Sequence, residues 1–292
     1  MCDEQQLARM GRAKVNRRDF GKLGAAAAVA TACAPAAAQG QVRLSENQAS
    51  FAAPNGRMDA YFVHPASGKR PAVIVWPDVA GLRDAFMAMG RRLAREGFAV
   101  LVLNPYYADG EAPQFDDFDD YRENGGAEKV GPWRAKLTAP TVMEIAKAAV
   151  GFLDKQDAVD TARGIGTEGY CMGGPFAVWT AAAVPERVKA AASFHGGRLV
   201  TNPASPDDPN LPVKLLGQTQ ASFLFAIARD DDRTAPTDKD ALKAAAAAAG
   251  RPAEVTVYAG NHGWTVVDSP AYDDTAAERA WARLVNLYKT AL

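Results

Sequence analysis

Cys171 is the residue whose sequence setting most clearly indicates chemistry. It lies in Gly169-Tyr170-Cys171-Met172-Gly173, the cysteine form of the G-x-S-x-G elbow, in which a strained turn between a strand and a helix exposes the central side chain. Glycine on both sides removes side chains that would collide with the returning helix. A helix starting at Met172 would direct free N–H groups at an anion, so the Met172 N–H is a candidate oxyanion donor. The alternative is a glycine-rich turn whose cysteine only packs.

A nucleophile of this kind needs a histidine base, and in this arrangement the histidine follows the nucleophile and the acid along the chain. The sequence contains three histidines. His262 follows the last expected strand and fits this order. His195 also follows a strand but precedes the candidate acids, so it is a candidate pocket residue, and His64, before a proline, is expected to be structural. His262 is therefore the predicted base.

The candidate acids are three consecutive aspartates, Asp230, Asp231 and Asp232, between a buried apolar run and a helical pattern. A carboxylate here would orient the histidine and stabilise its imidazolium form. Position alone allows any of the three, and the others would cap the following turn. The sequence has no H-E-x-x-H, C-x-x-C or Walker pattern, so we expect neither a metal nor an organic cofactor.

The elements that must position these residues alternate between strand and helix patterns from Met58 onwards. This alternation predicts an α/β fold with a mostly parallel sheet and helices on both faces. Strands are expected at 58–63, 72–76, 98–103, 164–170, 188–194, 222–228 and 254–258, and helices at 84–96, 141–155, 172–183, 236–249 and 275–292. The acidic and aromatic stretch 109–128 is expected to be a surface loop or short helix, with a calcium site as the alternative.

The motifs resemble those of the dienelactone hydrolase family, the carboxymethylenebutenolidase-like α/β-hydrolases, over nearly all of residues 50–292. The resemblance rests on Gly-Tyr-Cys-Met-Gly-Gly at 169–174, an aspartate four residues before Pro236, and Gly-Asn-His-Gly at 260–263. It implies an α/β-hydrolase fold. It also selects Asp232 as the acid that orients His262.

The same resemblance assigns two residues after the second buried strand, in the run Trp-Pro-Asp-Val-Ala-Gly at 76–81. Asp78 stands where family members commonly carry glutamate, and it would hold the cysteine protonated until substrate arrives. The backbone N–H of Val79 would be the second oxyanion donor.

The chain departs from the dienelactone-cleaving members at the two places where they carry substrate-binding arginines. It has Tyr106 and Tyr107 after the third strand and Trp264 after the histidine. We therefore expect a pocket rimmed by these aromatic residues and His195, and a less charged ester or lactone as substrate.

The expected reaction is hydrolysis of a small-molecule carboxylic ester or lactone through a thioester on Cys171. Two alternatives have the same residues: a ligand-binding or sensor protein without turnover, and an acyltransferase or thioesterase.

The N-terminus resembles a twin-arginine export signal. Arg17 and Arg18 are followed by Phe20, Lys22 and an uncharged, alanine-rich run ending in three alanines at 36–38, which suit a signal peptidase. We therefore expect a signal peptide at 1–38, the twin-arginine export machinery as a partner, and one hydrolase domain at 39–292 in the periplasm or outside the cell. A lipoprotein anchored at Cys33 is the alternative.

Composition sets the remaining limits. The chain has 33 basic and 34 acidic side chains in 292 residues, so no overall charge attracts nucleic acid. The uncharged N-terminal run is about sixteen residues, short of the roughly twenty needed to span a membrane, and we expect no transmembrane segment in the mature chain.

Overall fold

The computed structural model describes residues 42–292 of the chain. The predictions made for the export signal, its cleavage after residue 38 and lipidation at Cys33 lie outside the described residues and stay predictions. No helix among residues 42–292 is both long and apolar enough to cross a membrane.

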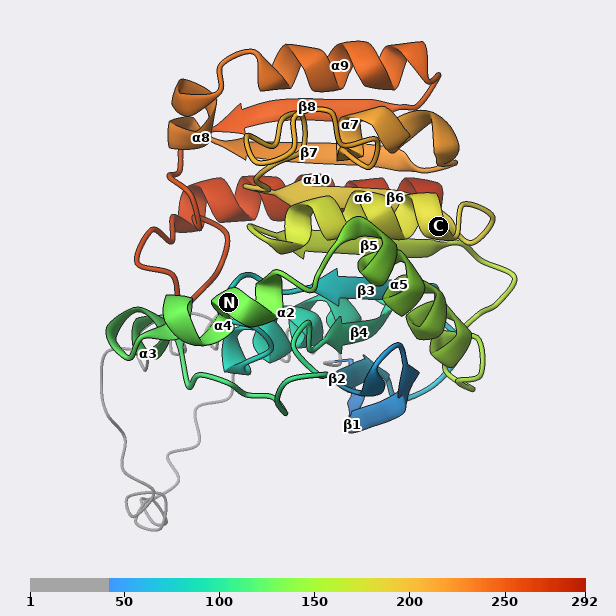
Figure 1. Cartoon of the computed structure of the whole chain (residues 1–292). Helices are drawn as coiled ribbons and strands as arrows, with labels where there is room; N and C mark the ends of the chain where they lie inside the picture. The colour runs from blue at the N-terminus through green and yellow to red at the C-terminus, as the bar shows by residue number, and fades with distance from the viewer. Residues whose placement is uncertain (1–41) are drawn as a thin grey trace, which may run out of the picture. The chain divides into compact units, whose positions relative to one another are not determined.

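An eight-stranded sheet runs through the described chain, in the order β1-β2-β4-β3-β5-β6-β7-β8 (Figure 1). The strands are β1 Leu44–Ala53, β2 Gly56–Pro65, β3 Ala72–Trp76, β4 Ala99–Leu103, β5 Ile165–Tyr170, β6 Val188–Phe194, β7 Ser222–Ala228 and β8 Ala253–Tyr258. β2 is antiparallel to both β1 and β4, and the strands from β4 to β8 are parallel. The predicted mostly parallel sheet is confirmed.

Helices cover both faces of this sheet (Figure 1). They are α2 Asp84–Arg95, α3 Phe118–Glu123, α4 Gly126–Arg134, α5 Ala139–Leu153, α6 Gly173–Ala183, α7 Pro212–Leu215, α8 Arg229–Thr234, α9 Asp238–Ala248 and α10 Asp274–Ala291. α5, α6, α7 and α9 pack on one face, and α2 and α10 pack on the other.

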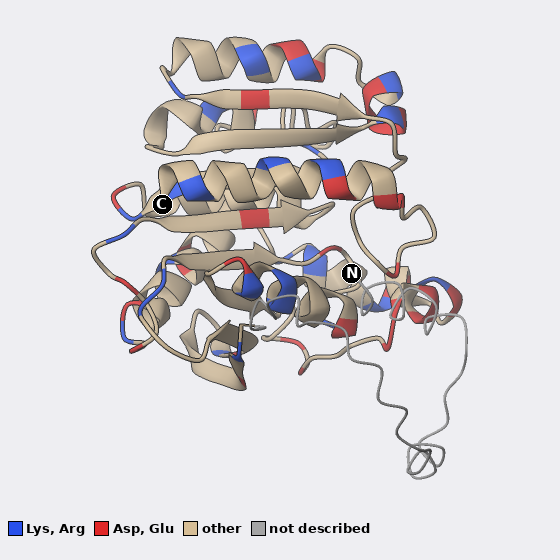
Figure 2. Cartoon of the chain, turned by 180° about the vertical axis from the view of Figure 1, so that it is seen from behind, with Lys and Arg blue, Asp and Glu red and all other residues tan. Residues whose placement is uncertain are grey.

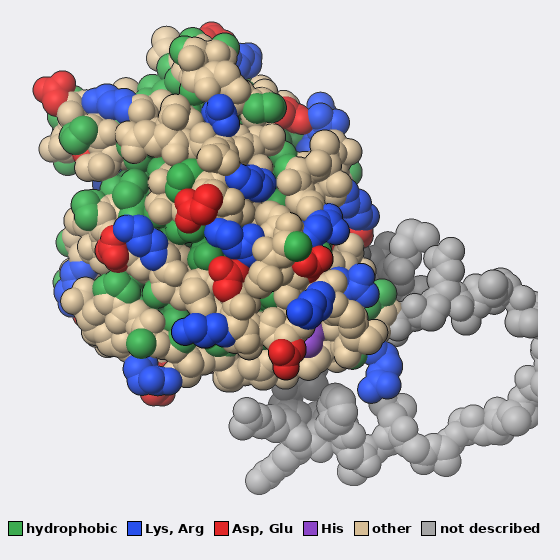
Figure 3. Space-filling model, turned by 90° about the vertical axis from the view of Figure 1, so that its right-hand side faces the viewer, with side chains coloured by type: hydrophobic (Ala, Val, Ile, Leu, Met, Phe, Trp, Pro, Cys, Tyr) green, Lys and Arg blue, Asp and Glu red, His purple; other side chains and the backbone are tan. Residues whose placement is uncertain are grey.

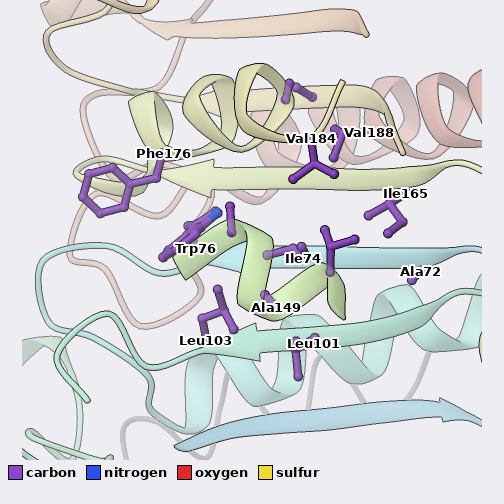
Figure 4. Packing of buried hydrophobic residues seen from close by; sticks show 14 of the residues in the cluster. Ala72, Ile74, Trp76, Leu101, Leu103, Ala149, Ile165, Phe176, Val184 and Val188 are labelled. Carbon is purple, nitrogen blue, oxygen red and sulfur yellow. The ribbon is translucent and has the colours of Figure 1, made fainter. Parts of the chain in front are cut away.

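The alternation of side chains along β3 shows how the sheet holds these two layers. Ala72, Ile74 and Trp76 belong to the apolar core on the α5 and α6 face (Figure 4), and Val73 and Val75 to the core on the other. Every residue of β3 is buried, as expected for a parallel strand covered on both sides. Fully burying each such large apolar side chain stabilises the fold by roughly 1.5–3 kcal/mol.

Three elements differ from the sequence expectation. β1 was not predicted, because it is an edge strand with mostly exposed residues, LSENQASFAA. The stretch 109–128 contains a short helix, α3, as one of the two expected forms, and also the start of a second helix, α4, which was not expected. The aspartate run at 230–232 lies inside α8 rather than in an extended turn.

The topology brings the candidate site residues to one edge of the sheet. Asp78, Cys171 and His195 directly follow β3, β5 and β6, α8 with the aspartates follows β7, and His262 follows β8. Since these five strands are parallel, their carboxyl ends meet at the same edge, where α/β proteins bind ligands.

The surface shows no charge segregation in the views of Figures 2 and 3. The ribbon in Figure 2 carries both acidic and basic positions along α2 and α10, and both signs are interspersed with apolar side chains on the face in Figure 3. This distribution agrees with the near-zero net charge of the sequence.

A buried carboxyl group in β5 gives the fold a testable pH dependence. The side chain of Glu168 is buried and accepts hydrogen bonds from the hydroxyls of Tyr170 and Tyr288, both at 3.0 Å. Burial raises the pKa of Glu168 to about 7, although the two tyrosine hydrogen bonds lower it. Between its ordinary pKa and about 7 the folded state binds the proton that the unfolded state has lost.

The free energy of unfolding should therefore fall as pH rises from about 4.5 to 7, by roughly 3 kcal/mol from this group. The variant Glu168→Gln is expected to lose this slope in urea denaturation at a series of pH values. Glu123→Gln, at an exposed position, should keep it. A slope that is the same in Glu168→Gln and in the unaltered protein would contradict the assignment.

Candidate active site

Cys171 lies on the strained turn that its sequence predicts. Its φ is 51°, in the left-handed region that costs a non-glycine residue energy and is concentrated at functional sites. A Cβ on Gly169 would lie 1.8 Å from the carbonyl oxygen of Gly173, and one on Gly173 would lie 2.4 Å from that of Trp76. Only glycine fits at either position, so the backbone itself holds the half-buried Cys171 in the turn that precedes α6.

His262 is held by two neighbouring aspartates. Its Nδ1 donates to both carboxylate oxygens of Asp231, at 2.8 and 3.1 Å, and its backbone N–H donates to Asp230 Oδ1 at 2.8 Å. Burial lowers the pKa of His262, but the hydrogen bond to Asp231 and the interaction with Cys171 outweigh it and raise the pKa to about 10. The geometry therefore favours an imidazolium next to the Cys171 sulfur.

The expectation that Asp232 orients His262 is wrong in this structure. Asp232 instead accepts a hydrogen bond from Nζ of Lys239, a residue of α9, at 2.6 Å. The reason is that α8 is helical, so successive side chains point about 100° apart around its axis. Asp231 faces His262 and Asp232 faces α9.

A small cavity of about 80 Å³ lies between these groups. Its lining combines the ends of four strands with the segment after His262 and one residue of α3: Asp78, Phe118, Cys171, His195, His262, Gly263, Ser269, Pro270 and Ala271. The cavity thus brings together Cys171, His262, His195 and Asp78 of the predicted site residues.

Asp78 is bound on one side by a buried arginine that was not predicted. The guanidinium of Arg83 donates to both Asp78 oxygens, at 2.8 and 3.0 Å, and also to both oxygens of Asp268, at 2.7 and 2.8 Å. Asp268 Oδ2 additionally accepts the backbone N–H of Phe118 at 3.1 Å. Arg83 therefore ties the loop after β3 to the segment after His262, which in turn contacts α3 through Asp268.

Burial raises the pKa of Asp78, while Arg83 opposes this shift by its charge and its hydrogen bonds. Asp78 Oδ1 also accepts the backbone N–H of Ala80, at 2.9 Å. The contacts of the carboxylate are those of an ion-paired group. Control of the Cys171 thiol by Asp78 stays a prediction.

The two expected oxyanion donors lie on facing turns of the site. Among the described residues the backbone hydrogen bonds of the elbow engage the N–H groups of Cys171 and Gly174, and none engages the N–H of Met172 or Val79. The Tyr106 hydroxyl donates to the Val79 carbonyl at 2.8 Å and lies 3.4 Å from the Met172 sulfur. Tyr106 thus contacts both turns, and the role of the two N–H groups as oxyanion donors stays a prediction.

The chain is similar to a group of known proteins. Residues 58–292 match the model of the dienelactone hydrolase family. The chain belongs to that family. A Methylorubrum extorquens protein named "Putative carboxymethylenebutenolidase" is 27% identical over 282 residues, covering 94% of this chain and 93% of that protein. An Escherichia coli K12 protein of the same name is 26% identical over 235 residues, covering 80% and 82%.

Among solved structures, the "Putative Dienelactone Hydrolase" of Klebsiella pneumoniae superimposes with a TM-score of 0.69 at 22% identity. The superposition covers 85% of this chain and 99% of the Klebsiella protein. The predicted α/β-hydrolase fold is thereby confirmed, and the family assignment makes the chain a hydrolase of the dienelactone hydrolase type.

In this dienelactone hydrolase-family chain, His195 lines the cavity as expected, but the other three expected rim residues, Tyr106, Tyr107 and Trp264, do not. Tyr106 is buried beneath the Val79 turn. Tyr107 turns away and donates to the carbonyl of Pro54. Trp264 is fully buried and stacks on Tyr258, with ring centroids 4.6 Å apart. The expected aromatic rim is therefore wrong, because these side chains belong to the supporting core.

The cavity residues that sequence reasoning missed come from loops far apart in the chain. Ser269, Pro270 and Ala271 follow His262 by seven to nine residues, and Arg83 reaches Asp268 across 185 positions. The one available signal was Arg83 itself, a charged residue five positions after Asp78 in the segment between β3 and α2.

The acidic residues at 116–120 serve the local structure of α3. The Asp117 side chain caps the helix by accepting the Asp120 backbone N–H at 2.7 Å, and Asp120 accepts from the Asp116 N–H and from Asn124. Within residues 42–292 no cluster of three or more His, Cys, Asp or Glu side chains could hold a metal ion.

The buried arginine supplies a stability prediction. Arg83→Met would leave the Asp78 carboxylate buried without its cation, which typically costs 3–5 kcal/mol. We expect a correspondingly lower free energy of unfolding in urea denaturation at neutral pH. Arg122→Met is the matched control, because Arg122 forms an exposed pair with Asp119 and such pairs contribute roughly 0–1 kcal/mol. Equal effects in the two variants would contradict the proposed weight of the Arg83 network.

Proposed function

We propose that this chain hydrolyses a small carboxylic ester or lactone, with Cys171 as the nucleophile, His262 as the acid and base, and Asp231 as the orienting carboxylate. The observation that carries the proposal is the meeting of Cys171 and an Asp231-bound His262 at one cavity at the carboxyl edge of the sheet. The family membership supports the hydrolytic class.

In the first step the Cys171 sulfur attacks the carbonyl carbon, and a C–S bond forms as the carbonyl π electrons move to oxygen. When the tetrahedral intermediate collapses, the C–O bond to the alcohol breaks, and the His262 imidazolium gives its Nε2 proton to the departing oxygen. The product is a thioester on Cys171. The raised pKa of His262, about 10, keeps that proton in place at neutral pH.

In the second step His262 is neutral and takes a proton from water, which attacks the thioester carbon. The C–S bond then breaks, the acid product leaves, and the proton taken from water stays with the pair of His262 and Cys171, which is ready for the next substrate. Asp231 stabilises the imidazolium in both steps.

Met172 and Val79 are proposed to donate their backbone N–H groups to the oxyanion. Loss of one such donor typically costs roughly 10²–10³-fold in rate. A backbone donor cannot be removed by a side-chain change, but Tyr106→Phe removes the hydroxyl that fixes the Val79 turn.

The lining of the cavity favours an uncharged reacting group. The guanidinium of Arg83 is already paired with two carboxylates, Asp78 and Asp268, and so offers no free cation to a substrate carboxylate. The volume of about 80 Å³ suits a short acyl group rather than a long chain.

The direct test is an assay of the purified full chain with short-chain p-nitrophenyl esters, enol lactones and dienelactone. Turnover of esters or lactones supports the proposal. A stable acyl adduct on Cys171 without turnover would instead place the chain among the ligand-binding or sensor proteins. Faster transfer to an added alcohol or thiol than to water would identify an acyltransferase.

We also propose that residues 1–38 direct export by the twin-arginine route, on the strength of Arg17 and Arg18 in the sequence. Replacing both arginines with lysine should retain the chain in the cytoplasm and leave its activity unchanged. Export of that variant at the original rate would contradict the proposal.

A further inference from the structure

His195 lies beside Cys171 at the carboxyl edge of the sheet, in a strained backbone conformation of its own. β5 and β6 pair in register at Tyr170 and Phe194, so Cys171 and His195 are the next residues of two neighbouring parallel strands. The φ of His195 is 40°, a value that costs a non-glycine residue energy and is retained where the surroundings require it. Both residues line the same cavity.

One ring nitrogen of His195 is fixed and the other has no partner. Nε2 shares a hydrogen bond of 3.0 Å with the hydroxyl of Thr265, on the segment that carries His262. Nδ1 is buried and makes no hydrogen bond of good geometry to any described residue, although the ring also interacts with the backbone of His195 itself. Buried polar atoms in native proteins are nearly always hydrogen-bonded, and an exception at a cavity indicates a group that a ligand or water satisfies.

The imidazole of His195 is neutral. The ring lies edge-on to that of His262, with centroids 4.9 Å apart, and its exposed fraction is 1%. Burial and the neighbouring His262 charge together hold the pKa of His195 well below its usual value. The charged groups nearest to the cavity from the other elements are Asp78, paired with Arg83, and Asp231, paired with His262.

We propose that His195 is a specificity-determining residue whose Nδ1 forms a hydrogen bond with an uncharged polar group of the substrate, such as a hydroxyl or ether oxygen near the scissile bond. A hydroxyl suits this position whichever tautomer Thr265 selects, because it can both donate and accept. A methyl group in its place would leave the buried nitrogen unsatisfied, which a site built around a hydrogen bond penalises.

This inference rests on the proposed hydrolase function, and two pairs of nearly isosteric esters separate the two claims. The first pair, p-nitrophenyl glycolate and p-nitrophenyl propionate, differs by hydroxyl against methyl on the acyl side. The second, 2-hydroxyethyl acetate and propyl acetate, has the same difference on the alcohol side. Rates of the full chain are divided by those of hydroxide ion to remove intrinsic reactivity.

The unaltered protein is expected to prefer the hydroxyl member of at least one pair by roughly tenfold in kcat/KM. In His195→Leu the ratio of kcat/KM between the hydroxyl and methyl members should fall to about one, and His195→Gln should recover part of the preference. The loss of preference in the variants should appear mainly as a raised KM for the hydroxyl member. A purely structural role for His195 would affect both members of a pair alike.

Turnover of both pairs by the unaltered protein without any preference would overturn the inference and leave the hydrolase proposal standing. This measurement uses only the unaltered protein and therefore does not depend on the folding of any variant. A preference that persists fully in His195→Leu would also overturn it. Failure to turn over any of the four esters would contradict the proposed function itself.

Discussion

Cys171→Ala is expected to reduce kcat for ester hydrolysis by roughly 10⁴-fold or more, because no thioester can form without the sulfur. The variant should fold normally, since alanine removes one atom at a half-buried position and leaves Gly169 and Gly173 in place. Its melting temperature is therefore expected to lie close to that of the unaltered protein. The measurement is steady-state kinetics with a p-nitrophenyl ester that the unaltered protein turns over.

The elimination of activity in Cys171→Ala must be separated from a general disturbance of the site. Cys171→Ser retains a hydroxyl at the same place and should keep weak activity, as serine is a poorer nucleophile than a thiolate beside an imidazolium. Full activity in Cys171→Ala would show that the reaction does not pass through this residue.

Asp231→Asn is expected to lower kcat by roughly 10⁴-fold, and Asp232→Asn by less than twofold. An amide can no longer accept the Nδ1–H of His262 on both oxygens or stabilise its imidazolium, which is the effect expected at an orienting carboxylate. Asp232 contacts Lys239 instead, so its change should affect only a partly exposed ion pair. The two adjacent and chemically identical substitutions are matched controls for each other.

The pH dependence of kcat/KM is a second measurement that distinguishes the variants Asp231→Asn and Asp232→Asn. The hydrogen bond to Asp231 is one cause of the raised pKa of His262, about 10. Removing it should lower that pKa, so the alkaline limb of kcat/KM is expected to move to lower pH in Asp231→Asn. Asp232→Asn should leave the limb in place. A larger loss in Asp232→Asn than in Asp231→Asn would contradict the observed geometry.

The sequence predicted those parts of the molecule that depend on local constraints. The elbow at Cys171 could be read directly from its contiguous glycine pattern, in which Gly169 meets the backbone of Gly173 four residues later. The buried parallel strands were equally readable from continuous apolar runs such as Ala-Val-Ile-Val-Trp at 72–76. His262 followed from its place after the last strand and the order of the site residues.

The parts that the sequence did not predict depend on orientation or on distant partners. Choosing among three consecutive aspartates required knowing that α8 is helical. In a helix, neighbouring side chains point in different directions, so Asp231 contacts His262 while the next residue, Asp232, contacts Lys239. The pairing of Arg83 with Asp268 joins segments 185 positions apart, and no local pattern records it. Tyr106 and Trp264 do lie on segments close to the site, as their sequence positions predict, but their side chains are buried in the core.

The most direct test of the central claim is the covalent state of Cys171 during turnover. The full chain and its His262→Ala variant would be mixed with an activated short-chain ester, quenched in acid within milliseconds to seconds, and digested for peptide mass spectrometry. The account predicts an added acyl mass on the peptide that contains Cys171, transient in the unaltered protein and persistent in His262→Ala, where no base activates water. Ester turnover by the unaltered protein with no adduct at any quench time in either protein, or an adduct on another residue, would contradict it.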